Sequence, residues 1–197
     1  MPPAEDIQRY LFGVWRMMTG RPDGLRMLDL SVDGFWNSFS AIVVALPAML
    51  AGWVPMANDA FGPDVPFAAR LAHVVRLAII DLGSWVIPLA IFVTVSGYVG
   101  LKDRVIPYVV ASNWASALLI WFLLPVSVID LFWPGARDAT SVLALVIFLV
   151  TLVLFWRLTN VAIAKGPAMA SAVFAGMFFA SLLVLFALQE LLGVPPL

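Results

Sequence analysis

The sequence contains no cysteine, a single histidine (His73) and no recognisable catalytic motif. Without cysteine the chain forms no disulfide, thiolate metal site or iron–sulfur cluster, and a single histidine excludes haem or metal ligation by two histidines of this chain. The HExxH, GxSxG and phosphate-binding GxxxxGK patterns are absent, and the carboxylates are scattered instead of paired for acid–base work. We therefore expect no bound cofactor and a protein that is not an enzyme.

Charge is also scarce, because charged residues make up 12% of the chain and hydrophobic residues 63%. The net charge of −1 gives no case for a nucleic-acid partner. Five long apolar runs instead fill the chain from Phe35 to Leu192. A helix needs about 20 mostly apolar residues to cross the hydrocarbon of a bilayer, whereas barrel strands alternate apolar and polar residues. These runs do not alternate, so we predict an all-α integral membrane protein surrounded by lipid.

The runs predict five transmembrane helices that form one polytopic bundle. Their expected ranges are 35–55, 72–97, 106–130, 140–159 and 168–191. The connections are short, so residues 35–197 are expected to form a single transmembrane domain. Prolines inside the ranges should kink the helices because proline lacks a backbone N–H; they are Pro47, Pro88 and Pro125.

Residues 1–34 are expected to form a cytoplasmic segment with an amphipathic helix. Apolar side chains recur there at helical spacing, and charged or polar residues occupy much of the rest of the circumference. The apolar positions are Ile7, Leu11, Val14, Trp15 and Met18. A short helix of this kind lies in the headgroup plane with its apolar side in the acyl boundary, so we predict an interfacial helix.

The basic residues predict the orientation of the chain. Eight of them lie before the first span, between spans two and three, or between spans four and five, and three lie on the opposite side. The three are Arg70, Arg76 and Arg137. The side with more arginine and lysine is cytoplasmic, so we expect a cytoplasmic N-terminus and an external, periplasmic C-terminus. Arginine in excess of lysine in a chain with short loops suggests a bacterial inner membrane.

Asp81 is the residue that is most costly to place in lipid. It lies within the second predicted span, on its outer half, where an ionised aspartate costs about 3 kcal/mol. One interpretation is a proton or cation site. The other, which we favour at this point, is a structural role in which Asp81 is neutral or paired with Arg76 or a donor on another helix. Arg76 precedes it by five residues, so this pairing depends on the long arginine side chain.

A group of polar residues gathers at the predicted inner ends of spans one, three and four. Its members are Asn37, Ser112, Asn113, Ser116, Arg157, Thr159 and Asn160. Hydrogen bonds between helices in a membrane contribute about 0.6–2 kcal/mol each and fix the helix register. Substrate binding is the alternative interpretation, and helix association is the one we favour.

Small residues recur every four positions along the fifth predicted span, at Ala168, Ala172, Gly176 and Ala180. Such a stripe lets another helix backbone approach closely. It predicts either packing inside the chain or contact with a second subunit, so a homo-oligomer or a larger membrane complex is expected.

The tryptophan and tyrosine residues divide into two groups. Those near the ends of the predicted spans are expected at the membrane interface: Trp36, Trp53, Tyr98, Tyr108, Trp133 and Trp156. Those that lie deeper need packing or a hydrogen-bond partner: Trp85, Trp114 and Trp121.

The layout resembles the Yip1-domain family of membrane proteins. The segment Leu101–Trp114 is similar to the basic loop that enters a polar third span in that family, and Trp156-Arg157 through Lys165–Ala168 to the loop that joins its last two spans. The resemblance covers about residues 35–192 and implies a cytoplasmic N-terminal part, five spans and a C-terminus on the far side. The aromatic–proline motif of eukaryotic members is not evident, so their GTPase binding and their functional residues are not carried over.

Two functions remain open. The first is a non-enzymatic membrane protein that acts through protein–protein or lipid contacts, as a scaffold, assembly factor or accessory subunit. The second is a transporter or channel for a small solute, ion or proton, with Asp81 as the ion-sensitive residue. Against the second, five spans do not divide into equal halves and no internal repeat is visible.

Overall fold

The computed structural model describes residues 1–61, 65–133, 135 and 137–195, and within these residues every regular element is helical. The loop residues Gly62, Pro63 and Asp64 lie outside this part. The elements are α1 (Ala4–Met18), η1 (Pro22–Met27), α2 (Val32–Asn37), η2 (Ser38–Ser40), α3 (Ala41–Asp59), α4 (Phe67–Val95), η3 (Lys102–Arg104), α5 (Val105–Phe132), α6 (Arg137–Ile163) and α7 (Pro167–Leu192).

Five helical stretches in the described part are long and apolar enough to cross a membrane, as the sequence predicted. They cover Val32–Asp59, Phe67–Val95, Lys102–Phe132, Asp138–Ile163 and Pro167–Leu192. Most of their ends lie beyond the predicted ones, because helical backbone geometry continues through polar residues that end an apolar run. The first begins earlier than expected: the Ser31 hydroxyl accepts a hydrogen bond from the Gly34 amide at 3.0 Å and caps α2.

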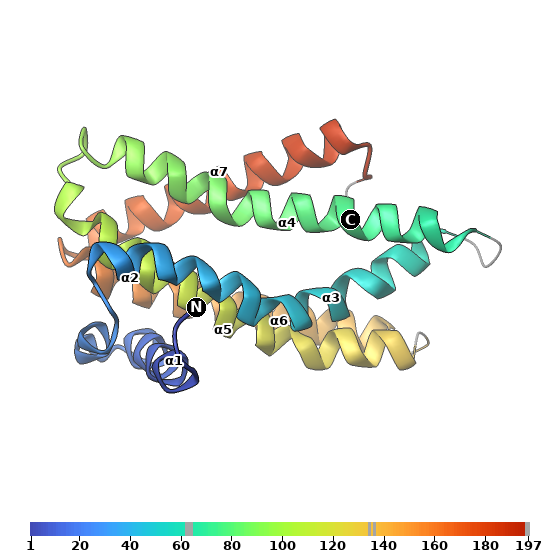
Figure 1. Ribbon diagram of the computed structural model, residues 1–197, viewed down its shortest axis with the longest axis horizontal. Coiled ribbons are helices and arrows are strands. Elements are labelled where there is room, and N and C mark those ends of the chain that lie inside the picture. The colour runs from blue at the N-terminus through green and yellow to red at the C-terminus, as the bar shows by residue number, and fades with distance from the viewer. Residues whose placement is uncertain (62–64, 134, 136, 196–197) are drawn as a thin grey trace.

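The five long helices close into a ring. α3 packs against α5, α5 against α6, α6 against α7, α7 against α4, and α4 again against α3. In Figure 1, α4 and α7 lie on one side of the molecule and α3, α5 and α6 on the other. Gly83 brings the first pair together, because a Cβ at this position would overlap the Leu188 side chain of α7. The interior of the ring is where a site can form.

The N-terminal helix α1 lies beside the bundle and runs roughly perpendicular to the long helices, so that Figure 1 shows it nearly end-on. It contacts α5 and α6, and it buries one face that includes Tyr10, Val14 and Met18. Trp15, which we assigned to the membrane-facing side, is partly exposed and packs edge-on against Phe122 of α5. Much of the apolar face of α1 is therefore covered by protein. Its contact with the membrane surface stays a prediction.

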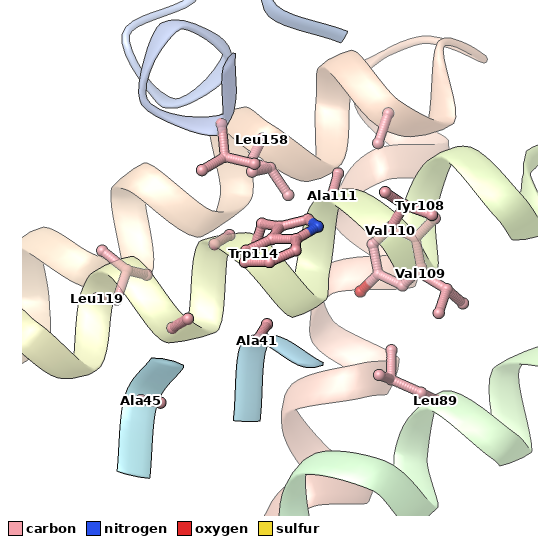
Figure 2. Packing of buried hydrophobic residues seen from close by; sticks show 14 of the residues in the cluster. Ala41, Ala45, Leu89, Tyr108, Val109, Val110, Ala111, Trp114, Leu119 and Leu158 are labelled. Carbon is pink, nitrogen blue, oxygen red and sulfur yellow. The ribbon is translucent and has the colours of Figure 1, made fainter. Parts of the chain in front are cut away.

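The packed core is centred on Trp114 of α5, whose side chain is 1% exposed. Figure 2 shows it between Leu158 of α6 and Ala41 of α3, with α1 on the far side of Leu158. Tyr10 of α1 lies against it, with ring centroids 5.2 Å apart. Small residues allow this packing, because the fully buried Ala41 and Ala45 let α3 approach α5 closely. The core thus fixes α1, α3 and α6 around the N-terminal half of α5.

Candidate functional site

A partly open cavity of about 540 Å³ lies between the long helices, and residues of all five spans line it. Most of the lining is apolar or aromatic. Its polar members are one carboxylate and six hydroxyl side chains besides Tyr108: Asp81, Ser84, Ser112, Ser116, Ser127, Thr151 and Ser181. Several of these hydroxyls donate to their own helix, as Ser84 does to the Ile80 carbonyl at 2.7 Å. Asp81 is therefore the strongest polar feature of the cavity.

Asp81 lies at the midpoint of α4, fourteen residues from Phe67 (81 − 67) and fourteen from Val95 (95 − 81). The helix begins before the predicted residue 72, and the place of Asp81 on the outer half of its span stays a prediction. The Trp53 indole Nε1 donates a hydrogen bond of 2.6 Å to Asp81 Oδ2. This bond joins α3 to α4 across the cavity wall, and within the described residues it is the only hydrogen bond or ion pair of Asp81.

Arg76 does not join this site. Its side chain is exposed, and it makes no ion pair with Asp81 in the part of the chain that the structure describes. The five-residue separation explains the difference, because it places the two side chains well apart around α4. The donor on another helix, which we named as the alternative partner, is Trp53.

Asn113 forms a second polar link between helices. Its Oδ1 accepts a hydrogen bond from Trp85 Nε1 at 2.9 Å, and its Nδ2 donates to Ser38 Oγ at 2.8 Å. The asparagine and the serine are fully buried. One amide therefore holds α4, α5 and the η2 turn together, which is the role in helix association that we favoured for the inner polar residues.

The predicted inner cluster does not come together as one site. Asn113 takes part in the link with Trp85 and Ser38, while Ser112 and Ser116 line the cavity. Asn37 and Arg157 are exposed, and Asn160 is half-buried. The residues share one end of the bundle but face different directions around their helices.

Other tryptophans also donate hydrogen bonds between helices. Trp121 Nε1 donates to the Val44 carbonyl at 3.0 Å, and Trp156 Nε1 to Ser171 Oγ at 3.0 Å. The Val44 carbonyl lies next to the position where Pro47, without a backbone N–H, interrupts the helical hydrogen bonds of α3. With Trp85 and Trp114, Trp121 confirms the expectation that the deeper tryptophans are hydrogen-bonded or packed.

Trp53 and Tyr108 contradict their expected place at the membrane interface. Trp53 is 3% exposed and Tyr108 is fully buried, and both line the cavity. Tyr108 was expected at the interface near the end of its span, but its ring packs at a tilt against Phe92 of α4, with centroids 4.6 Å apart. Exposed aromatic residues near helix ends are Trp36, Tyr98 and Trp133.

Two hydroxyl groups of α5 beside the cavity, those of Tyr108 and Ser112, lie one turn apart and have almost no accessible surface. The Tyr108 hydroxyl interacts with the side chains of Ser112 and of Thr159 on α6. These groups therefore belong to the packing between α5 and α6.

The small-residue stripe of α7 points away from the cavity. Ala168, Ala172 and Gly176 are exposed, and a Cβ at Gly176 would meet no atom within 4 Å. Ala180 is half-buried. The first three residues of the stripe therefore do not pack against other helices of this chain. Contact with a second subunit is the interpretation that remains for them.

A salt bridge joins two loops at one end of the bundle. Lys165 Nζ, between α6 and α7, lies 3.4 Å from Asp103 Oδ1, which precedes α5. On the N-terminal segment, Arg16 pairs with Asp23, and this hydrogen bond holds the pKa of Asp23 below its usual value. Hydrogen bonds from Ser31 likewise lower the pKa of Asp29. These groups lie outside the cavity and hold the segment folded.

Comparison with protein-family models, with curated proteins and with solved structures gives no match to this chain. The resemblance to the Yip1-domain family therefore stays a prediction.

Proposed function

We propose that this protein binds a small, mostly apolar molecule in the partly open cavity lined by its five membrane helices. The observation that carries the proposal is the cavity itself, about 540 Å³ in volume and lined by every span. Ligand pockets in proteins are typically about 300–1,000 Å³, largely apolar, with a few polar groups that orient the ligand. The lining matches this description, with Asp81 and the serine and threonine hydroxyls as the polar groups.

Transport is the form of this function that the position of Asp81 favours. The carboxylate lies at the midpoint of α4, and substrate sites of secondary transporters lie near the bilayer midplane. Our proposal thus develops the second hypothesis drawn from the sequence, in which Asp81 serves a small-solute carrier.

The proposed orientation keeps the N-terminus in the cytoplasm of a bacterial cell, with the C-terminus in the periplasm. The distribution of basic residues supports it, because the end of the bundle where Lys165 contacts Asp103 carries more of them than the other end. Arg70 and Arg76 belong to the opposite end. The side chain of Arg137, which we also counted there, lies outside the described residues.

Association with a second subunit is the other candidate function. The stripe Ala168, Ala172 and Gly176 is exposed, and such small residues allow close helix contact in membranes. If it forms a homo-oligomer or a scaffold contact, Gly176→Leu should shift the protein to smaller species in cross-linking experiments. Unchanged cross-linking would argue against this surface.

Native mass spectrometry tests the cavity proposal. The protein is released from gentle detergent, and the masses of molecules that stay bound are recorded. Ser84 lines the cavity, so Ser84→Phe should fill part of it and remove the bound mass. Ala90 lies on the same helix with its side chain exposed, and Ala90→Phe is the matched control that should keep it. Identical bound masses in wild type and in Ser84→Phe would contradict the proposal.

A further inference from the structure

We infer that the molecule held in the cavity is a lipophilic cation: an apolar, aromatic-sized body with one positive charge, placed against Asp81. This inference depends on the proposed binding function and specifies its ligand class. It follows from the charge of the lining, from its aromatic residues and from the hydrogen bonding of Asp81.

The lining carries one charge sign only. Asp81 is its single acidic side chain, and no lysine, arginine or histidine lines the cavity. Arg76, the nearest arginine along α4, is exposed on another side of that helix. A cationic ligand supplies the missing opposite charge. An anionic ligand would lie near the Asp81 carboxylate and would find no basic side chain with which to pair.

One oxygen of the Asp81 carboxylate accepts a hydrogen bond from the described residues, and the other does not. Trp53 donates to Oδ2 at 2.6 Å, and the described residues provide no hydrogen bond to Oδ1. Since an ionised carboxylate accepts several hydrogen bonds or a close cation, Oδ1 remains for the ligand. Trp53 acts as a positioning residue, because its indole fixes the carboxylate at the wall between α3 and α4.

Aromatic rings surround the rest of the cavity. They come from each long helix: Trp53, Trp85, Tyr108, Phe148, Phe155, Phe174 and Phe178. The face of an aromatic ring attracts a cation, and the attraction is larger where water is excluded. One carboxylate among aromatic rings is the arrangement by which proteins recognise alkylated ammonium and similar cations.

The same lining argues against a phospholipid. A phospholipid amine is accompanied by a phosphate, and the phosphate would find no basic side chain in the lining. A cation without an attached anionic group fits the cavity better. The apolar body of the ligand would lie against residues such as Met49, Leu89 and Met177.

The test compares two ions of nearly the same shape and opposite charge, tetraphenylphosphonium and tetraphenylborate. Binding is measured to the full chain in nanodiscs of phosphatidylglycerol, with empty discs as background. Wild type should bind tetraphenylphosphonium, and Asp81→Asn should weaken this binding at least about tenfold while leaving tetraphenylborate binding no weaker. Asp130→Asn is the matched control on α5: Asp130 accepts a hydrogen bond from Thr140 and does not line the cavity, so its loss should leave cation affinity unchanged.

The outcomes separate this inference from the proposed function. Unchanged tetraphenylphosphonium affinity in Asp81→Asn, with weaker binding of either ion in Ser84→Phe, would overturn the cation inference and leave the cavity as a binding site. Unchanged binding of both ions in Ser84→Phe would overturn the two together. Addition of phosphatidylethanolamine to the discs should not compete, and competition would assign the site to a lipid amine instead. A thermal unfolding scan of each variant in the same discs identifies any variant that fails to fold. If Asp81→Asn fails to fold, Asp81→Glu takes its place in the test. This variant keeps the negative charge and must retain cation binding.

Discussion

Trp53 and Asp81 are joined by a 2.6 Å hydrogen bond, and this bond connects α3 to the midpoint of α4 at the wall of the cavity. Each residue explains the position of the other. The indole N–H of a buried tryptophan needs an acceptor, and a carboxylate in the middle of a membrane helix needs a donor. The bond also connects α3 and α4, two neighbours in the ring of five spans.

Loss of this bond should destabilise the bundle. Trp53→Phe keeps an aromatic ring but removes the donor, so we expect the free energy of unfolding to fall by about 1–2 kcal/mol. Thermal unfolding in detergent measures the change. Trp133 is 68% exposed, and Trp133→Phe is the matched control, expected to have little effect. Equal unfolding temperatures for Trp53→Phe and wild type would show that the bond is not structural.

Asn113→Leu should be more damaging. The substitution preserves approximate volume but removes both the acceptor for Trp85 and the donor to Ser38, leaving their polar groups buried without partners. We expect a loss of about 1–3 kcal/mol for each group left unsatisfied. Asn37 is exposed, so Asn37→Leu should be nearly neutral in the same unfolding experiment. A neutral Asn113→Leu would contradict the bridging role of the amide.

The N-terminal segment should be sensitive to one glycine. Gly24 of η1 packs on α1 so closely that a Cβ would overlap the Gly13 carbonyl oxygen and approach the Cβ of Arg16 to 2.9 Å. We expect Gly24→Ala to cost about 1–3 kcal/mol and to loosen the segment. Limited proteolysis between α1 and η1 reports the loosening. At Gly97 a Cβ would meet nothing within 4 Å, and Gly97→Ala should remain as resistant as wild type.

Acid should weaken the turn before the first span. Hydrogen bonds from Ser31 hold the pKa of Asp29 below its usual 3.8, so the ionised form stabilises the folded segment. This contribution is complete above about pH 3.8 and is lost as the pH falls through the lower pKa of the folded state. Hydrogen exchange at residues 29–34 should therefore increase on acidification in wild type, after correction for intrinsic exchange rates. In Asp29→Asn this increase should be smaller, and an equal increase in both proteins would refute the assignment.

The sequence was sufficient to predict the five long helices and to single out Asp81. Apolar runs of this length have one common solution in a membrane, and an aspartate in such a run is conspicuous. The partner of Asp81 was not predictable, because Trp53 is 28 positions away in the chain and its direction depends on how α3 and α4 pack. Trp53 itself was the available signal, because it lies inside an apolar run. In the sequence, however, a tryptophan that donates to a buried carboxylate cannot be distinguished from one at the membrane interface.

The cavity could not be read from the sequence at all. It depends on the ring of contacts that α4 and α7 complete, and hence on which faces of five apolar helices turn inward. Serine residues spaced along α5 gave a partial signal, since Ser112, Ser116 and Ser127 all line the cavity. Asn113, adjacent to Ser112, points to a different neighbour, Ser38, so sequence proximity alone merged two separate groups.

Anomalous diffraction from crystals grown with tetraphenylarsonium tests the central claim most directly, because the arsenic atom marks the position of a bound lipophilic cation. Our account predicts an arsenic peak within the ring of spans, beside Asp81 and between the aromatic rings of the cavity, and its disappearance in Asp81→Asn crystals. Arsenic peaks found solely on the outer, lipid-facing surfaces of the helices would contradict it.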